Sequence, residues 1–160
     1  MTSITPPYQV QWVFGHLTEA LRRQIVAFWL QEGALPNPDE AWRRSFEVAC
    51  VLQAKETGEI AGICTVAIAL DDQARSYGFV RIFVRPRDRR MGLNVQLMER
   101  MIAGFMAFAR EPGAPQRLLA TVENRKLERR GAQRILTQLG FAHVGVAPNG
   151  EWIMQRTLVA

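Results

Sequence analysis

The sequence has no apolar run long enough to cross a lipid bilayer. Its longest one, Ile60–Leu70, is about half of the roughly 20 residues that a spanning helix needs. Residues 1–7 lack the basic start and the apolar core of a signal peptide. We therefore expect a cytoplasmic protein rather than a secreted or membrane-bound one.

Cysteine and histidine are scarce, with two residues of each. Cys50 and Cys64 both lie within apolar runs, which predicts small buried thiols rather than a disulfide, a nucleophile or metal ligands. His16 and His143 are far apart in the sequence and have no cysteine or carboxylate at ligand spacing. The sequence therefore predicts a reducing compartment and no metal site.

Repeats, low-complexity tracts and long linkers are absent as well. The chain has 160 residues, of which 48% are apolar and 22% charged. This composition is typical of a globular protein that buries roughly 70% of its unfolded surface on folding. We expect one domain that spans residues 1–160.

Hydrophobic periodicity and turn residues predict a mixed α/β fold, with strands and helices in the order β-α-α-β-β-β-α-β-α-β-β. Thr18 and Asn37 have the side chains of helix N-caps, and Gly33 and Gly140 stand where helices should end. The strands are expected at 8–14, 48–54, 60–70, 77–85, 117–122, 141–146 and 152–158. The helices are expected after each N-cap and at 93–108 and about 126–139.

The net charge of +5 is concentrated in two short segments. Residues 81–90 contain five arginines against Asp88, and residues 125–134 contain five basic residues against Glu128. Basic residues gathered in this way favour a local anion site over a general affinity for polyanions, since a nucleic-acid binder usually spreads them over a whole face. Two solvated helix faces, or a nucleic-acid surface made by both segments, are the alternatives.

The most informative segment is Val84–Asn94, which contains the end of a strand, a basic loop and the start of the longest helix. Free N–H groups and the positive end of the helix dipole favour anions at such a junction. Gly92 leaves room for an anion beside the backbone, and Arg89 and Arg90 can add charge-assisted hydrogen bonds. Neither the dinucleotide pattern nor the P-loop pattern occurs.

This segment resembles the signature of the GNAT N-acetyltransferases. The family places a proline after a strand, an Arg or Gln three residues later, a Gly three further on, and a Gly or Ala two beyond. Pro86, Arg89 and Gly92 match, whereas Asn94 departs from the pattern and puts a larger side chain beside the pyrophosphate. A second signature of the family, a helix that ends in Gly-Phe before a strand, resembles 132–141 with Asn124 upstream.

The resemblance implies an acyl-coenzyme A site. In such proteins the strand before the loop diverges from its neighbour at a bulge, so that its backbone pairs with the pantetheine arm and one N–H holds the thioester oxyanion. The loop amides and the arginine of the motif hold the pyrophosphate. The implied cofactor-binding residues are Ile82, Phe83, Val84, Arg89, Arg90, Met91, Gly92, Leu93, Asn94 and Asn124.

The resemblance leaves the general acid and base open. Many members have a tyrosine five residues before the Phe of Gly-Phe, and Leu136 stands there in this chain. Tyr77 is the candidate proton donor in its place. Glu123 is the candidate base, with Asp71 and Asp72 or a water chain as alternatives.

We expect an enzyme that transfers an acetyl group directly from acetyl-CoA to a primary amine in a ternary complex, without a metal. The acceptor can be a small molecule or a protein or peptide amine, and a homodimer remains open. An aromatic and acidic mouth would suit a cationic amine, although aromatics on helices such as Trp29, Trp42 and Phe46 are more often core. The alternatives are a non-catalytic acyl-CoA sensor or partner-binding module, and a nucleic-acid-binding protein.

Overall fold

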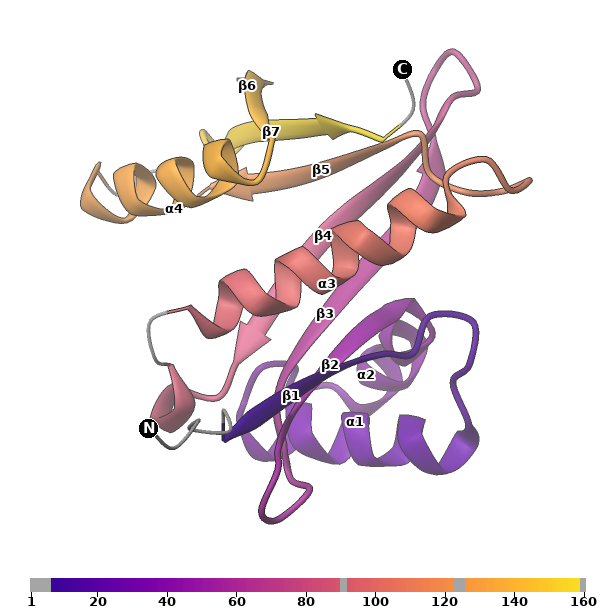
Figure 1. The fold of residues 1–160 in the computed structure, drawn as a ribbon, viewed down its shortest axis with the longest axis vertical. Helices are drawn as coiled ribbons and strands as arrows, with labels where there is room; N and C mark the ends of the chain where they lie inside the picture. Colours follow the sequence, from indigo (N-terminus) through magenta and orange to yellow (C-terminus); the bar gives the residue numbers. More distant parts are fainter. Residues whose placement is uncertain (1–6, 90–91, 123–125, 159–160) are drawn as a thin grey trace, which may run out of the picture. The chain divides into compact units, whose positions relative to one another are not determined.

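The computed structural model describes residues 7–89, 92–122 and 126–158, and for 126–129 it describes the backbone. Within these residues the order of strands and helices is the expected one, with two short 3-10 turns, η1 and η2, added (Figure 1). The elements are β1 (Tyr8–Trp12), α1 (Glu19–Gln31), α2 (Pro38–Arg44), η1 (Ser45–Glu47), β2 (Val48–Ala54), β3 (Ile60–Leu70), β4 (Ser76–Val84), η2 (Pro86–Asp88), α3 (Leu93–Phe108), β5 (Arg117–Val122), α4 (Lys126–Gln138), β6 (Ala142–Val146) and β7 (Trp152–Thr157).

The seven strands form a mixed sheet in the order β1-β2-β3-β4-β5-β7-β6. β4 and β5 are parallel, whereas β2 pairs antiparallel with β1 and with β3, and β7 pairs antiparallel with β5 and with β6. The expected α/β fold class is therefore confirmed. The position of β7 between β5 and β6 is a feature that the sequence order does not indicate.

The chain divides into two compact units. The first unit contains Met1–Thr65 and Ile82–Met101, and the second contains Val66–Arg81 and Ile102–Ala160. β3, β4 and α3 each contribute residues to both units. That residues 1–160 act as one domain stays a prediction.

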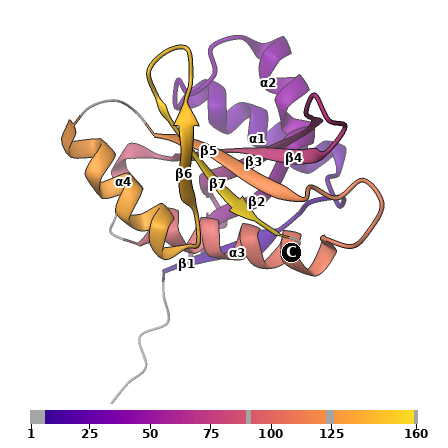
Figure 2. The ribbon, with the colours of Figure 1, turned by 90° about the horizontal axis from the view of Figure 1, so that it is seen from above.

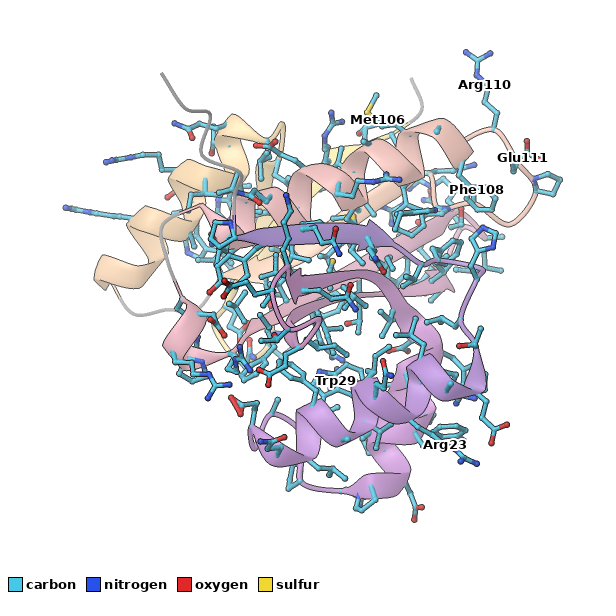
Figure 3. All side chains as sticks on the ribbon, turned by 60° about the horizontal axis from the view of Figure 1, so that its bottom comes forward. Arg23, Trp29, Met106, Phe108, Arg110 and Glu111 are labelled. Atoms are coloured by element: carbon cyan, nitrogen blue, oxygen red, sulfur yellow. The ribbon has the colours of Figure 1, made fainter. Side chains whose placement is uncertain are left out.

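In the first unit, α1 covers the strands with one apolar stripe. The Thr18 side chain accepts a hydrogen bond from the Leu21 amide at 3.1 Å, which begins the helix as expected. Ile25 and Trp29 are buried, and Figure 3 shows Trp29 pointing toward the strands while Arg23 points away from them. Burial of each such side chain contributes roughly 1.5–3 kcal/mol, so packing rather than helix propensity stabilises α1.

Arg22 joins α1 to α2 through a buried guanidinium group. Its Nε donates to Ser45 Oγ at 2.8 Å and a terminal nitrogen donates to the Trp42 carbonyl at 2.9 Å. The same group lies 3.6 Å from the ring centroid of Trp42 and 3.2 Å from that of Phe46. Trp29 therefore belongs to the core, whereas Trp42 and Phe46 pack on Arg22 and keep 37% and 62% of their surface exposed. That these two exposed aromatics line a mouth for an acceptor stays a prediction.

In the second unit, β5 presents one buried and one open face. Leu118, Ala120 and Val122 are buried, whereas Leu119 and Thr121 between them are half-exposed. α4 follows β5 in the chain and contacts it (Figure 1), and the β6–β7 hairpin extends the sheet beyond β5 (Figure 2). This alternation leaves a row of odd-numbered side chains on the open face of the sheet.

Candidate functional site

The junction between β4 and α3 begins with the 3-10 turn η2, and a left-handed glycine, Gly92, directly precedes α3. Pro86 ends β4 because proline has no N–H to offer a neighbouring strand. The Asp88 amide then donates to the Arg85 carbonyl at 2.8 Å, which forms η2. Gly92 has a φ of +96°, and its carbonyl accepts the first helical hydrogen bond from the Gln96 amide at 2.9 Å.

A buried ionic network holds this turn in place. Asp88 accepts hydrogen bonds from the Tyr8 hydroxyl and from the Arg85 guanidinium, and all three residues are buried. Arg85 also contacts Glu59 at 3.2 Å. Burial alone would raise the pKa of Asp88, but the hydrogen bonds from Arg85 and Tyr8 outweigh it and lower that pKa. The turn is thereby fixed to β1 and to the β2–β3 connection.

This network corrects the simple charge count of residues 81–90. Arg85 is paired with two carboxylates, and Arg87 lies 3.5 Å from Glu59, so neither is an unpaired cation. Because carboxylates already neutralise these two groups, the segment is a weaker attractant for a polyanion than its sequence predicts. The nucleic-acid alternative loses part of its support.

Arg89 lies against the end of β4. Its Nε donates to the Val84 carbonyl at 2.8 Å, and its guanidinium is 5.4 Å from the ring centroid of Phe83. The residue is exposed. These contacts position the Arg89 side chain. Of the two arginines expected to bind the pyrophosphate, Arg89 is the one that the structure describes.

The start of α3 offers backbone amides to open space. The first turn of a helix leaves N–H groups without intrahelical acceptors, and here that turn includes Leu93 and Asn94. A Cβ added to Gly92 would meet no atom within 4 Å, so the backbone is accessible at that point. The Asn94 side chain lies beside these amides and accepts from the Val95 amide at 3.0 Å. The expected ligands Arg90 and Met91 lie outside the described residues.

The end of β4 is bonded to β3. The Arg85 amide donates to the Ala61 carbonyl at 2.7 Å. Ile82 and Phe83 are half-buried and Val84 is buried, with the Phe83 ring edge-on to Phe28 at 5.9 Å between centroids. The strand residues expected to meet a pantetheine arm are therefore packed in the first unit, where Val84 and Phe83 also contact Arg89.

Within the second unit the β4–β5 ladder is short. Tyr77, Gly78 and Phe79 pair with residues 117–119, and no further pairs occur for Val80 and Arg81 among the described residues. Both strands continue beyond this point, β5 in pairing with β7 as far as Val122. A ladder that stops while its strands continue is the divergence that the family resemblance implies, although no bulge is described there.

A depression of about 410 Å³ opens beside this divergence, entirely within the second unit. Three strands and the β6–β7 turn supply its walls, with odd-numbered side chains on the open face of the sheet. The lining residues are Phe79, Arg81, Leu119, Thr121, Ala147, Asn149, Glu151 and Ile153. Sequence reasoning missed this group, although the period of two in β4 and β5 already places residues 79, 81, 119 and 121 on one face.

Tyr77, the candidate proton donor, is not among the lining residues of this depression. It pairs in register with Arg117 at the first position of the ladder, and the Arg117 guanidinium lies 5.5 Å from its ring centroid. Arg117 in turn donates to Asp71 at 2.9 Å. Glu123, the candidate base, and Asn124, a candidate cofactor ligand, lie outside the described residues.

Asp71 is a poor general base. Its carboxylate accepts from the Arg75 amide and the Gln73 amide, as well as from Arg117. The Arg75 hydrogen bond has the largest influence and, with the others, lowers the pKa of Asp71 to about 2 against the opposing effect of burial. A carboxylate of this acidity binds protons weakly near neutral pH, so the alternative that gave Asp71 a catalytic role is weakened.

Leu136 is buried in α4. The position at which many family members have a tyrosine therefore contributes an apolar side chain to the core of the second unit. The second basic segment is exposed at Arg130 and Arg134, the members whose side chains the structure describes.

The described residues contain neither a cluster of metal-ligating side chains nor a helix suited to a membrane span. No three His, Cys, Asp or Glu side chains of the described segments are grouped so that they could hold a metal ion. Among the helices of residues 7–89, 92–122 and 126–158, none combines the length and the apolarity that a bilayer span requires. Cys50 and Cys64 are free and buried, which agrees with the thiols expected from the sequence.

Comparison with known proteins decides the family. Residues 14–141 match the model of the acetyltransferase (GNAT) family, which is most of the chain. The chain belongs to this family. The resemblance drawn from Pro86, Arg89 and Gly92 is thereby confirmed, and acetyl transfer is the chemistry of the GNAT family. No curated protein matches the sequence.

Solved structures share the fold at low sequence identity. A GNAT acetyltransferase from Streptococcus pneumoniae is 18% identical, with a TM-score of 0.70 over 96% of this chain and 99% of that one. The ribosomal-protein-S5-alanine acetyltransferase from Vibrio fischeri is 14% identical, with a TM-score of 0.68 over 98% and 96%. A phosphinothricin acetyltransferase from Sinorhizobium meliloti, in complex with AcCoA, is 16% identical, with a TM-score of 0.70 over 96% and 89%. The GNAT fold is common to all three.

Proposed function

We propose that this GNAT protein is an N-acetyltransferase that moves the acetyl group of acetyl-CoA to the primary amine of an acceptor. The observation that carries the proposal is the turn from Pro86 to Gly92. Gly92 is left-handed, with open space where a Cβ would stand, at the start of a long helix, and a buried network fixes residues 85–88 ahead of it. A helix start with accessible amides suits a pyrophosphate, because amides already fixed by the helix need little rearrangement on binding.

Acetyl-CoA is the proposed acetyl donor and no metal is required. The amides of Gly92, Leu93 and Asn94, with the Arg89 guanidinium, would hold the pyrophosphate, and the backbone of Ile82–Val84 would pair with the pantetheine arm. Arg90, Met91 and Asn124 are proposed ligands from the family resemblance. The Sinorhizobium meliloti neighbour in complex with AcCoA supports this choice of donor.

The chemistry needs no covalent enzyme intermediate. The neutral amine attacks the thioester carbonyl, a C–N bond forms, and the C–S bond breaks to release the coenzyme A thiolate. A backbone N–H at the end of β4 would hold the developing oxyanion, an effect typically worth about 3 kcal/mol. The amine proton passes to a base, for which Glu123 is proposed, and the thiolate is protonated by Tyr77 or by solvent.

A thiolate leaving group tolerates the absence of a tyrosine at position 136. With a thiol pKa of about 8.5, it departs without an acid more readily than an alkoxide would, but the loss of general-acid help costs about 10²-fold in rate. The buried Leu136 therefore favours a slow enzyme or, as the second candidate function, an acyl-CoA sensor without turnover. Release of coenzyme A distinguishes the two.

The decisive experiment incubates the purified protein with acetyl-CoA and a panel of amino acids, simple amines, polyamines and peptides. An acetyltransferase releases coenzyme A above the hydrolysis background with at least one class, and mass spectrometry finds the acetylated amine. A sensor shows a rise in melting temperature with acetyl-CoA but no release with any acceptor. A protein whose melting temperature does not respond to acetyl-CoA would contradict both functions. The cytoplasmic location remains part of the proposal.

A further inference from the structure

The depression in the second unit has two opposite charges in its lining that do not neutralise each other. Arg81 is exposed on β4, and Glu151 is half-buried immediately before β7. Within the described part of the chain neither side chain forms an ion pair. A direct ion pair between Arg81 and Glu151 would stabilise both charges, but the two side chains do not form one. Their arrangement therefore suits a ligand that carries both a negative and a positive charge.

Side-chain contacts hold each charged group at its place in the depression. The Arg81 guanidinium lies 4.9 Å from the ring centroid of Phe79, a cation–π contact that leaves its N–H donors free for an acceptor. Glu151 accepts a hydrogen bond from the Asn149 side-chain amide at 2.9 Å, and its own amide donates back to Asn149 at 3.0 Å. Both groups are therefore partly ordered before any ligand arrives, which lowers the entropy cost of binding.

The distance between the two walls suits a small molecule. β4 and β7 flank β5 on opposite sides. Where neighbouring strands are paired they are about 4.8 Å apart, which puts the two outer strands roughly 10 Å apart, and Arg81 lies beyond the last β4–β5 pair, where the strands are no longer held at this spacing. Leu119 and Ile153 give the depression an apolar part between its charged residues. Its volume of about 410 Å³ lies in the lower part of the range for small-molecule sites, roughly 300–1,000 Å³.

We infer that the depression binds an acceptor amine that also carries a carboxylate, that is, an amino acid with an apolar side chain. Arg81 binds the carboxylate, Glu151 lies toward the amine, and the apolar residues contact the side chain. The role of this ligand as the acetyl acceptor rests on the proposed acetyltransferase function, but its binding to the depression does not depend on turnover. Polyamines and other purely cationic amines are disfavoured, because Arg81 repels an additional positive charge.

The test compares amino acids with the amines that lack only the carboxylate. The probes are L-phenylalanine with phenethylamine, L-leucine with isopentylamine, and L-methionine with 3-(methylthio)propylamine. Binding to the protein saturated with coenzyme A is measured by calorimetry or ligand-observed NMR. At least one amino acid should bind ten-fold or more tightly than its decarboxylated partner.

Arg81→Gln is the diagnostic variant and Arg110→Gln its matched control. Arg110 is an exposed arginine in the turn after α3, and its side chain points outward (Figure 3). Arg81→Gln should remove the preference for the amino acid, because the amino acid loses the partner of its carboxylate, whereas the decarboxylated amine should bind as tightly as to the wild type or more tightly once the repelling charge is gone. Arg110→Gln should keep the preference. The rise in melting temperature with acetyl-CoA should be the same in both variants, which shows that each is folded.

The inference is wrong if the decarboxylated amines bind as well as the amino acids, if no amino acid binds at millimolar concentration, or if Arg81→Gln keeps the preference. Failure of the proposed function has a different signature. In that case an amino acid binds in an Arg81-dependent manner, but no coenzyme A is released from acetyl-CoA. Glu151→Gln adds a second check, because it should weaken binding of both members of each pair equally.

Discussion

Tyr8, the first residue of β1, donates a hydrogen bond to Asp88 in the turn that leads from β4 to α3, 80 residues further along the chain. Asp88 also accepts from the Arg85 guanidinium, and all three side chains are buried. A buried carboxylate is tolerated only when it is paired and hydrogen-bonded, so this contact ties the position of the turn to β1. The geometry of the proposed coenzyme A loop thus depends on a residue near the amino terminus.

Loss of the Tyr8 hydroxyl should destabilise the protein and weaken coenzyme A binding. Tyr8→Phe removes one hydrogen bond to a buried charge, which costs about 1–3 kcal/mol of unfolding free energy. Asp88→Asn should cost more, about 3–5 kcal/mol, because it leaves the Arg85 cation buried without its nearest partner. Urea unfolding near neutral pH gives the free energies, and calorimetry with coenzyme A gives the affinity.

Tyr77→Phe is the matched control, because Tyr77 is the second of the two tyrosines and its hydroxyl has no hydrogen bond among the described residues. Its unfolding free energy should remain within about 0.5 kcal/mol of the wild type. Equal stability of Tyr8→Phe and wild type would show that the buried hydrogen bond contributes nothing. If Tyr8→Phe is destabilised but binds coenzyme A with unchanged affinity, the buried network stabilises the fold without controlling the geometry of the coenzyme A loop.

Substitution of Gly92 should abolish coenzyme A binding without unfolding the protein. Gly92 has a φ of +96° and open space where a side chain would begin, so valine is strained there by about 1–2 kcal/mol and projects toward the proposed pyrophosphate. Gly113 is the matched control, with a φ of +83° and equally open surroundings. Gly92→Val and Gly113→Val should lose similar stability, but only Gly92→Val should lose the melting-temperature rise with coenzyme A. Retention of that rise in Gly92→Val would contradict the loop assignment.

Acid should remove the contribution of Asp71 to stability. The pKa of Asp71 is lowered to about 2, mainly by the Arg75 amide, and lies below the value of about 3.9 expected for an unfolded chain. A carboxylate whose pKa is lowered on folding stabilises the native state above the unfolded value, and this stabilisation disappears as the pH falls from about 4 to about 2. Melting temperatures of wild type and Asp71→Asn should therefore differ near pH 6 and converge near pH 2.

Asp72→Asn is the control for Asp71, because Asp72 is the next residue and is exposed. Its melting temperature should follow the wild-type curve throughout the titration. A constant difference between wild type and Asp71→Asn at every pH would mean that the carboxylate charge is not the source of the stabilisation.

The two thiols should be unreactive in the native protein. Burial raises the pKa of Cys50 to about 12 and raises the pKa of Cys64 as well. The two residues are paired in register across β2 and β3 and are fully buried. Because the thiolate is the reactive form, a thiol reagent near pH 8 should label neither residue until denaturant is added. Rapid labelling of the native protein would show that the β2–β3 core opens locally, and it would also complicate a thiol-based assay of coenzyme A release.

Local signals in the sequence determined the elements of this fold. The N-caps at Thr18 and Asn37, the period of two in the strands and the apolar stripe of α3 are each decided by residues within a few positions of one another. Helix hydrogen bonds and strand pleats are local geometry, so the expected order and most boundaries were correct. The motif at Pro86 and Gly92 is local too, whereas the left-handed conformation of Gly92 is a finding of the structure, because glycine permits a positive φ but does not require it.

Only the tertiary structure decided which charged groups are available to a ligand. In the sequence, Arg85 and Arg81 belong to one basic segment, but folding pairs Arg85 with Asp88 and Glu59 and leaves Arg81 beside Phe79 in the depression. Likewise, Glu151 comes close to β4 only because β7 inserts between β5 and β6. Strand order and burial arise from contacts between residues that are distant in the chain. Composition contains no information on position, and periodicity describes only residues that are a few positions apart. Neither therefore predicts such contacts.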